Sequence, residues 1–241
     1  MAGALLEVEG LTKRFGGFTA LQRVTLHVKA GERFGLIGPN GSGKTTLINC
    51  VSGALAADGG RILFEGRDIT TLPAYQRTRL GIVRSFQIPK PFTSMTVLEN
   101  LGIPLEYAAH TRSPGADAAA KAMDILRTIG LDSKSHLRPA GLNQIEMRKL
   151  ELARAMAARP KLLISDEAMA GLSSAEVDDI LAILFRLNEQ RITVIMIEHI
   201  MRAVMRFSER IVVLDAGERI AEGTPDEIVR NPAVEKAYLG E

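Results

Sequence analysis

The chain has 241 residues, of which 46% are hydrophobic and 24% charged, a balance that excludes a disordered tail and predicts a globular protein with a sizeable core. Lys and Arg exceed Asp and Glu by 30 to 28, a net charge of only +2, which disfavours nucleic acid as a charge-driven partner. The single cysteine, Cys50, excludes an internal disulfide and indicates a reducing compartment. No apolar run approaches the length of about 18 residues that a membrane-spanning helix needs, so we do not expect the chain to cross a membrane. The length of the chain predicts one large α/β unit.

The first fifty or so residues predict antiparallel strands, then a strand that ends in a glycine loop. LLEVEGLTKRFGGFTAL and LQRVTLHVKAGE alternate apolar with polar residues and are interrupted by glycine, which is typical of antiparallel strands. ERFGLIG then runs straight into GPNGSGKTT, and LINCVSG continues with a helical pattern. We therefore expect a strand, a glycine loop and a helix in that order.

The middle of the chain changes from strands to helices. Two further short strands are expected, at residues 61–64 and in GIVRSF. From about residue 91 to 159 the pattern becomes helical, and AAAKAMDILRTIG repeats apolar residues at spacings of three and four. We expect a helical subdomain over residues 91–159 and a core formed by residues 1–90 and 160–241.

The last third of the chain indicates a parallel sheet. KLLIS, ITVIMIE and RIVVLD are short and aliphatic, and helical segments separate them. That alternation is typical of parallel strands buried on both faces. VVLDAGERIAEG then predicts a terminal hairpin.

Residues 38–45 match the pattern G-x-x-x-x-G-K-[ST] at every fixed position. The glycines allow successive backbone N–H groups to point at phosphate oxygens, and the start of the following helix adds its positive dipole end. Lys44 is then expected to neutralise the β- and γ-phosphates and Thr45 to bind Mg²⁺. A glycine-rich turn that merely contains a lysine is the alternative, but a strand before it and a helix after it favour nucleotide binding.

Polar residues follow three of the predicted parallel strands. Asp166 and Glu167 end KLLIS, and parallel sheets bind ligands at this edge. Asp166 is expected to hold Mg²⁺ through water and Glu167 to polarise an attacking water; a solvated acidic turn is the alternative. Gln87 and His199 end two other strands, where they can orient water, although a lone histidine is more often structural.

One aromatic residue precedes the phosphate loop. Phe15 lies in the glycine-flanked segment KRFGG, where it is either an ordinary core residue or a platform that stacks on a purine base. The methionines at 169, 196, 201 and 205 have spacings that fit core packing, and we assign them no other role.

Phe15, GPNGSGKTT, Gln87, LLISDE and His199, in this order, closely resemble the nucleotide-binding subunit of ABC transporters over essentially the whole chain. The resemblance implies a RecA-like P-loop core with an antiparallel β subdomain and a helical subdomain, and the cofactors ATP and Mg²⁺. It implies that ATP is held by Phe15, Gly38, Pro39, Asn40, Gly41, Ser42, Gly43, Lys44, Thr45 and Thr46, and by Asn143 and Gln144 across a dimer. It assigns Mg²⁺ to Thr45, Gln87 and Asp166, and catalysis to Lys44, Gln87, Glu167 and His199.

Within that superfamily the chain is most similar to the ATPases of branched-chain and hydrophobic amino acid uptake systems. VRSFQ, PFTSMTVLENL and the ending AEGTPDEIVRNPAVEKAYLGE carry this narrower similarity. Lipopolysaccharide export ATPases have a related ending and remain an alternative. AGLSSAE resembles the D-loop that reaches across the dimer.

The chain departs from the family at the signature motif, usually LSGGQ or a close variant. The aligned residues are Leu142, Asn143, Gln144, Ile145 and Glu146. Structurally, Asn143 and Glu146 form a predicted capping pair at a helix start. Functionally, Ile145 is expected to add bulk, and Glu146 negative charge, where backbone approaches a γ-phosphate. Ala168 also replaces the usual proline after Glu167.

The resemblance implies a peripheral ATPase at the cytoplasmic face of the inner membrane, which powers integral membrane permease subunits. A second ATPase chain is expected, with a heterodimer favoured over a homodimer, and a solute-binding protein takes part indirectly. Two other functional classes fit the sequence less well. ABC ATPases that act on DNA or ribosomes usually carry coiled-coil insertions, zinc-binding cysteines or two cassettes, and a small-molecule kinase would lack Glu167 and His199.

Overall fold

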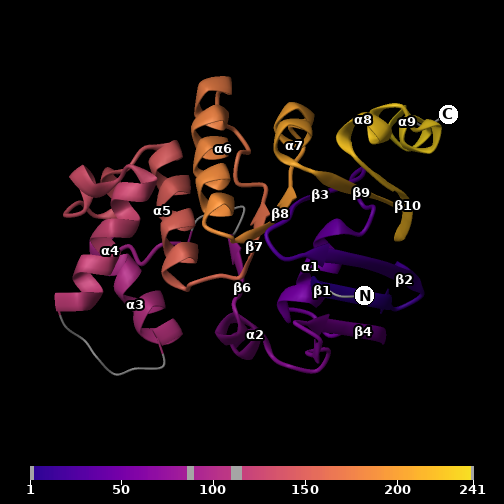
Figure 1. The fold of residues 1–241 in the computed structure, drawn as a ribbon, viewed down its shortest axis with the longest axis horizontal. Coiled ribbons are helices and arrows are strands. Elements are labelled where there is room, and N and C mark those ends of the chain that lie inside the picture. The colour runs from indigo at the N-terminus through magenta and orange to yellow at the C-terminus, as the bar shows by residue number, and fades with distance from the viewer. Residues whose placement is uncertain (1–2, 86–89, 110–115, 240–241) are drawn as a thin grey trace.

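The computed structural model describes residues 3–85, 90–109 and 116–239. Within these residues the chain forms two β-sheets and nine α-helices (Figure 1). The first sheet is antiparallel, with the strand order β2-β1-β4-β5. Its strands are β1 (Ala4–Phe15), β2 (Phe18–Lys29), β4 (Gly59–Phe64) and β5 (Arg67–Asp68). This sheet is the expected antiparallel subdomain.

The second sheet has six strands in the order β10-β9-β3-β8-β7-β6. All neighbours are parallel except β10, which forms the expected terminal hairpin with β9. The strands are β3 (Arg33–Ile37), β6 (Ile82–Ser85), β7 (Leu162–Asp166), β8 (Thr193–Ile197), β9 (Arg210–Asp215) and β10 (Glu218–Gly223). Because its parallel strands end at one edge, the segments that follow β3, β7 and β8 come together there.

The helices cover both faces of the parallel sheet and form a separate group at one side. Helices α3, α4 and α5 make up that group (Figure 1), within the range expected to be helical. The helices are α1 (Lys44–Ser52), α2 (Ala74–Leu80), α3 (Val97–Ala109), α4 (Ala116–Ile129), α5 (Gln144–Ala157), α6 (Ser174–Glu189), α7 (Met201–Phe207), α8 (Pro225–Val229) and α9 (Pro232–Leu239). Short 3₁₀ turns lie at Asp132–Lys134 and Pro139–Gly141. In the described ranges, no helix is long and apolar enough to cross a bilayer.

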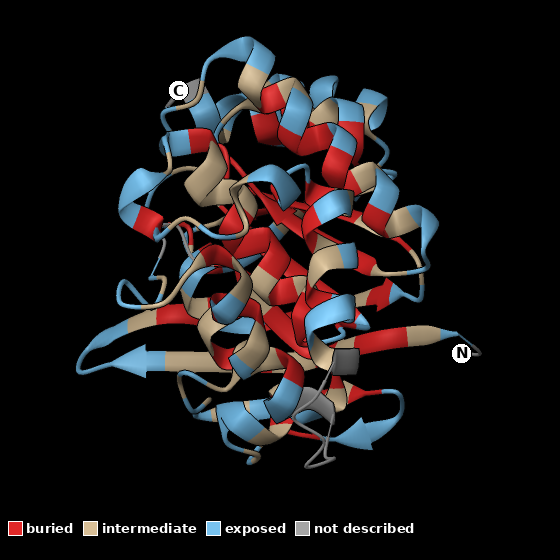
Figure 2. Cartoon of the chain, turned by 90° about the vertical axis from the view of Figure 1, so that its left-hand side faces the viewer, coloured by how far each residue is buried: buried red, intermediate tan, exposed pale blue. Residues whose placement is uncertain are grey.

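The parallel sheet is buried on both faces because its side chains alternate between two cores. Leu162 and Ile164 of β7 pack against α1 and the antiparallel sheet, whereas Leu163 between them packs against the helices on the other face. Buried residues accordingly concentrate on the central strands, and exposed residues lie on the outer faces of the helices (Figure 2). The aliphatic runs of the sequence follow from this two-sided burial.

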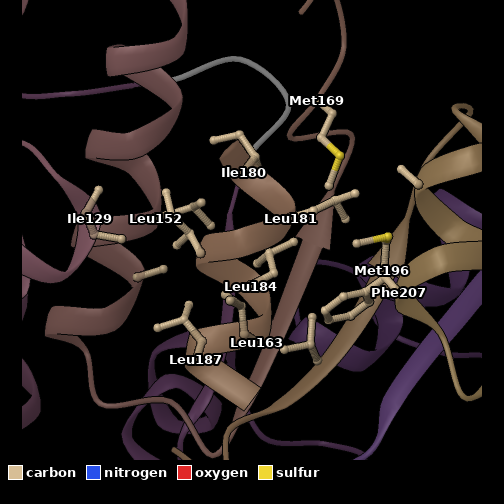
Figure 3. Close-up of a cluster of buried hydrophobic side chains, with 14 of the residues drawn as sticks. Ile129, Leu152, Leu163, Met169, Ile180, Leu181, Leu184, Leu187, Met196 and Phe207 are labelled. Atoms are coloured by element: carbon tan, nitrogen blue, oxygen red, sulfur yellow. The ribbon is translucent and has the colours of Figure 1, made fainter. Parts of the chain in front are cut away.

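The second of these cores joins the helical group to the sheet. Leu181 and Leu184 of α6 lie between Leu152 of α5 and the strand residues Leu163 and Met196 (Figure 3). Met169 and Met196 are fully buried, and Met201 and Met205 pack against the same cluster, as their spacing predicted. The fold expected from the sequence, a parallel-sheet α/β core with an antiparallel sheet and a helical part, is confirmed.

Candidate functional site

The loop between β3 and α1 adopts a backbone that only glycine permits at its two ends. Gly38 has a φ of 150°, and a Cβ there would lie 2.0 Å from the Leu214 carbonyl oxygen. Gly43 has a φ of 103°, and a Cβ there would lie 2.7 Å from the Ala20 carbonyl oxygen. A side chain at either position would push the loop away from strands β9 and β2, which carry these two carbonyl groups.

The N-terminus of α1 is open to an anion. Its N-cap is Gly43, which offers no side-chain cap, and the first turn has no acidic residue. The first N–H groups of a helix carry partial positive charge and lack partners within the helix. This terminus is therefore arranged to receive a phosphate group.

Lys44 is folded back over the same loop. Its Nζ donates to the carbonyl oxygens of Gly38 at 2.8 Å and Pro39 at 2.9 Å, and lies 3.4 Å from the Ser42 hydroxyl. Burial lowers the pKa of Lys44, and the nearby carboxylates of Glu167 and Asp166 act in the opposite direction. The loop thus holds a largely buried ammonium group between its own carbonyls and the acidic residues.

A cleft of about 260 Å³ brings most of the predicted site residues together. The residues that line it are Phe15, Phe18, Ala20, Asn40, Gly41, Ser42, Gly43, Lys44, Thr45, Thr46, Glu167 and His199. Phe15 and Phe18 face each other across the β1–β2 hairpin and are 49% and 63% exposed, so neither is a core residue. The Lys13 ammonium lies 5.4 Å from the centre of the Phe15 ring.

The Asp166 carboxylate at the end of β7 forms a buried ion pair with Arg84 of β6. The Arg84 Nη2 and Nε groups donate to Asp166 Oδ2 at 2.5 and 3.2 Å, and Nη1 donates to Asn49 Oδ1 at 2.6 Å. The side chains are only 13% and 9% exposed. Asn49 lies on α1, so this network links the first turns beyond the phosphate loop to two strands of the sheet.

Glu167 and His199 meet at the mouth of the cleft. Glu167 Oε1 and His199 Nε2 are 2.9 Å apart, although the residues belong to different strand ends. The Glu167 backbone has a φ of 49°, in the left-handed region, and its N–H donates to the Ile197 carbonyl at 2.9 Å. A carboxylate paired with an imidazole in this way can orient and deprotonate a water molecule.

The residues expected to bind Mg²⁺ have the chemistry that this ion requires. Thr45 is exposed at the start of α1 and offers a hydroxyl oxygen, while Asp166 offers a carboxylate at the sheet edge. Mg²⁺ prefers oxygen ligands and usually retains several waters, so two protein groups with a phosphate are sufficient. Gln87, the third expected ligand, lies outside the described residues.

The start of α5 differs from the start of α1 because it is closed by its own side chains. Asn143 Oδ1 accepts from the Glu146 N–H, and Glu146 Oε2 accepts from the Asn143 N–H, both at 3.0 Å. This is the capping box that the sequence predicted. Lys134 donates to Glu146 Oε1 at 2.6 Å, and this hydrogen bond is the main reason that the pKa of Glu146 lies below its usual value.

Two of the three remaining signature positions, Gln144 and Ile145, are oriented by tertiary contacts. Ile145 is only 9% exposed and belongs to the hydrophobic core, so the expectation that it adds bulk at a phosphate position is wrong. The Ile145 side chain therefore points into this core and not toward the end of the helix. Gln144 is exposed, and its Nε2 lies 3.5 Å from the Ala170 carbonyl oxygen of the same chain.

With this geometry in place, comparison with known proteins gives a clear result. A family model described as "ABC transporter" matches residues 21–170, and one described as "Branched-chain amino acid ATP-binding cassette transporter" matches residues 218–241. The chain belongs to the ABC transporter family. It is 39% identical to the high-affinity branched-chain amino acid transport ATP-binding protein BraF of Pseudomonas aeruginosa and 38% identical to LivG of Escherichia coli K12, in each case over the full length of both chains.

Solved structures agree with this membership. The structure is similar to the crystal structure of a nucleotide-free ATP-binding cassette from an ABC transporter, with a TM-score of 0.89 and 34% identity over 99% of this chain and 100% of that one. The ADP conformation of the cassette MJ1267 gives the same TM-score with 35% identity over 99% of each chain. These matches confirm the resemblance inferred from the order of the motifs, including the narrower one carried by the C-terminal segment.

Four residues of this region were not singled out from the sequence. Phe18 is recognisable only because two glycines separate it from Phe15 and place the rings on one hairpin. Arg84 reaches Asp166 from β6, and Asn49 of α1 accepts a hydrogen bond from Arg84. Glu198 precedes His199 and is 3% exposed, in a segment that read as a buried strand. The only signal in the sequence was the position of Glu198 at the end of the aliphatic segment ITVIMIE, where a buried carboxylate needs a polar partner.

Proposed function

We propose that this chain is the ATP-hydrolysing subunit of a transporter that takes up branched-chain or similar hydrophobic amino acids. The observation that carries the proposal is the full-length similarity to relatives named for branched-chain amino acid transport, together with a matching C-terminal segment. The open phosphate loop and the Glu167–His199 pair supply the chemistry that such a subunit needs.

The adenine and the phosphates of ATP occupy different parts of the cleft. Phe15 stacks on the adenine, and its exposed ring on the β1–β2 hairpin supports this role. The N–H groups of residues 38–46 bind the β- and γ-phosphates, and Lys44 exchanges its loop carbonyls for phosphate oxygens. Thr45, Asp166 and Gln87 would hold Mg²⁺, which would supply positive charge to neutralise the phosphates.

Hydrolysis depends on the pair at the mouth of the cleft. Glu167 accepts a proton from the attacking water, and His199, 2.9 Å from that carboxylate, holds Glu167 and the γ-phosphate in line. The left-handed backbone of Glu167 directs its side chain into the cleft rather than along the strand. Gln87 contributes from the segment that follows β6.

Membrane attachment comes from partner chains. Integral membrane permease subunits hold the protein peripherally at the cytoplasmic face of the inner membrane, and a solute-binding protein takes part only through the permease. The docking surface lies over residues 91–130 together with Gln87. Within that range Phe92, Ile103 and Tyr107 are between 37% and 40% exposed and supply large apolar side chains that a permease could contact.

The second ATPase chain is a different protein, so that the transporter contains a heterodimer. In an ABC dimer each ATP lies between the phosphate loop of one chain and the signature helix of the other. The signature helix of this chain is closed by Asn143 and Glu146, so two copies would give two incomplete sites. A partner with a regular signature would complete the site built on Lys44, Glu167 and His199.

The catalytic assignment is tested with Glu167→Gln in the purified chain and in the assembled transporter. The amide keeps the shape of the side chain but cannot accept a proton, so MgATP affinity should stay within about threefold while hydrolysis falls at least about a hundredfold. Glu189→Gln, at the exposed end of α6, is the matched control. Hydrolysis by Glu167→Gln at near the wild-type rate would contradict the assignment.

The substrate and the heterodimer are tested in the same transporter. In a transporter reconstituted with its permease and solute-binding protein, leucine, isoleucine and valine should stimulate ATP hydrolysis, whereas lipopolysaccharide should not. Glu167→Gln in this chain should reduce transport far more than the equivalent change in the partner. Equal damage from the two changes would show that the two sites are equivalent and would overturn the asymmetry.

A further inference from the structure

A third carboxylate lies behind Asp166 and Glu167 and has no part in the proposed chemistry. Glu198 stands between β8 and His199 and is 3% exposed. Burial raises the pKa of Glu198 to about 7, with a further contribution from the nearby carboxylates of Glu167 and Asp166. Burying a carboxylate costs free energy of folding unless hydrogen bonds compensate for the lost water, so Glu198 needs partners in the protein interior.

The contacts of Glu198 join two backbone segments of the catalytic pair. Its Oε1 accepts a hydrogen bond of 2.9 Å from the Met169 N–H, two residues beyond Glu167. Glu198 is joined to His199 directly by the peptide bond, and the nearby His199 N–H acts against the rise in the pKa of Glu198. One buried side chain thus ties the turn that carries Glu167 to the strand end that carries His199.

The turn that Glu198 holds is strained. Glu167 has a φ of 49° and Gly171 a φ of 77°, and a non-glycine residue in the left-handed region persists only when its surroundings hold it there. The Glu167 N–H fixes one end through the Ile197 carbonyl oxygen, at 2.9 Å. The Met169 N–H bond to Glu198 fixes the middle of the turn.

The opposite side of the turn is in contact with the signature helix. The Ala170 carbonyl oxygen lies 3.5 Å from both Gln144 Nε2 and Arg148 Nη2 of α5. A Cβ at Gly171 would lie 2.8 Å from Gln144 Nε2, so glycine leaves the room that this side chain occupies. The turn is therefore held between the buried carboxylate on one side and α5 on the other.

From these contacts we infer that Glu198 is a positioning residue for ATP hydrolysis, which fixes the turn from Glu167 to Gly171 so that Glu167 and His199 face each other. The inference rests on the proposed role of Glu167. Glu198 touches neither nucleotide nor water in this assignment, and it acts through the backbone of Met169 and His199. Its removal should therefore leave ATP binding intact and reduce the rate of hydrolysis.

The test compares Glu198→Gln and Glu198→Met in the full chain. Gln keeps an oxygen that can accept from Met169, whereas Met has a similar length and no such oxygen. Glu32→Met is the matched control, because Glu32 is also a buried glutamate, 7% exposed, but binds Arg210 and the Lys29 N–H far along the chain from the turn. MgATP affinity is measured on the purified chain, and kcat and KM on the assembled transporter.

A second readout does not depend on activity. Hydrogen–deuterium exchange of the peptide that contains residues 166–172 should be at least tenfold faster in Glu198→Met than in the wild type, and nearly unchanged in Glu198→Gln. We expect Glu198→Met to lower kcat at least thirtyfold with KM and MgATP affinity within twofold, and Glu198→Gln to retain at least a fifth of kcat. Glu32→Met should lower the melting temperature without changing kcat or that exchange.

Different outcomes would contradict the positioning role of Glu198 and the proposed ATPase function. Wild-type kcat in Glu198→Met, or unchanged exchange at residues 166–172, would overturn the positioning role. Equal loss of MgATP affinity and kcat in both Glu198 variants would also overturn it, because it would mark a general folding defect. If the wild-type transporter failed to hydrolyse ATP, the proposed function would fail, and exchange would still decide whether Glu198 holds the turn.

Discussion

Two helices of this protein begin at segments that the family resemblance assigns to phosphate binding, yet their N-termini are built in opposite ways. At α1 the N-cap is Gly43 and no acidic side chain occupies the first turn. At α5 the N-cap is Asn143, and the Glu146 carboxylate closes the turn from the inside. At α5 the capping box satisfies N–H groups that a helix terminus leaves unpaired, whereas at α1 no side chain does so and these groups stay available to a ligand.

The difference shows how the same physical need can produce a binding site or abolish one. A helix that caps itself gains stability, commonly about 1 kcal/mol for the cap residue alone. The α1 helix has no side-chain cap, so its terminus stays free for an anion. The neighbouring Lys44 adds a positive charge, which the carbonyl groups of the phosphate loop stabilise while no phosphate is bound. The α5 terminus is therefore the more stable and the less receptive of the two.

The largest effect is expected from an attempt to make α5 resemble the family. Ile145→Gly restores a glycine at the signature, but it removes a core side chain and places glycine inside a helix, which together cost about 4 kcal/mol of unfolding free energy. Ile145→Val, the matched control, should cost only about 1 kcal/mol. Urea denaturation measures both. A stable Ile145→Gly protein would show that the side chain is not anchored in the core.

The next largest effect concerns the open terminus. Lys44→Ala removes the ammonium group that the loop and the acidic residues surround, and MgATP affinity should fall about a hundredfold, equivalent to about 3 kcal/mol. Lys149→Ala on α5 is a suitable control for the loss of a lysine at a helix away from the loop. Calorimetric titration measures the MgATP affinity of both variants, and an unchanged affinity in Lys44→Ala would show that Lys44 does not bind the nucleotide.

A smaller effect tests the cap of α5 directly. Asn143→Ala removes the acceptor for the Glu146 N–H and should lower the unfolding free energy by about 1 kcal/mol. Asn143→Ser keeps an acceptor and should lie close to the wild type. Denaturant midpoints at constant slope give the comparison, and equal stability of the alanine and wild-type proteins would mean that the observed bond contributes nothing.

The smallest effect depends on pH. The hydrogen bond from Lys134 holds the pKa of Glu146 below its ordinary 4.5, so the folded state gains stability from ionised Glu146 above that pH and loses it as pH falls through the lowered pKa. Glu146→Gln should therefore be less stable than wild type by under about 1 kcal/mol at pH 7, because the pair is partly exposed. Denaturant curves from pH 7 to pH 3 should converge at the acidic end.

The same variant sharpens the functional side of the comparison. Asn143→Ser with Glu146→Gln removes the negative charge at the start of α5 and gives these two positions the residues of the usual LSGGQ signature, without touching the core. Asn143→Ser with Glu146→Gln should raise ATP hydrolysis by the isolated chain severalfold. If the isolated chain already hydrolyses ATP cooperatively at a rate that the double change does not improve, the closed signature is a tolerated variant.

The sequence by itself determined the parts of the protein whose chemistry is local. The spacing in GPNGSGKTT, the aliphatic runs of the buried strands and the pairing of Asn143 with Glu146 three residues later each depend on neighbours in the chain. Local patterns of this kind are set by backbone geometry and hydrogen-bond reach, so they can be recognised without a fold.

Only the tertiary structure decided which residues meet across the sheet edge. Arg84 and Asp166 are 82 positions apart, and Met169 and Glu198 are 29 apart, yet each pair shares a buried hydrogen bond. The inward direction of Ile145 likewise depends on how α5 packs against the core. Such contacts arise because parallel strands that are distant in the chain end side by side, and nothing in the local sequence records which side chain will face which.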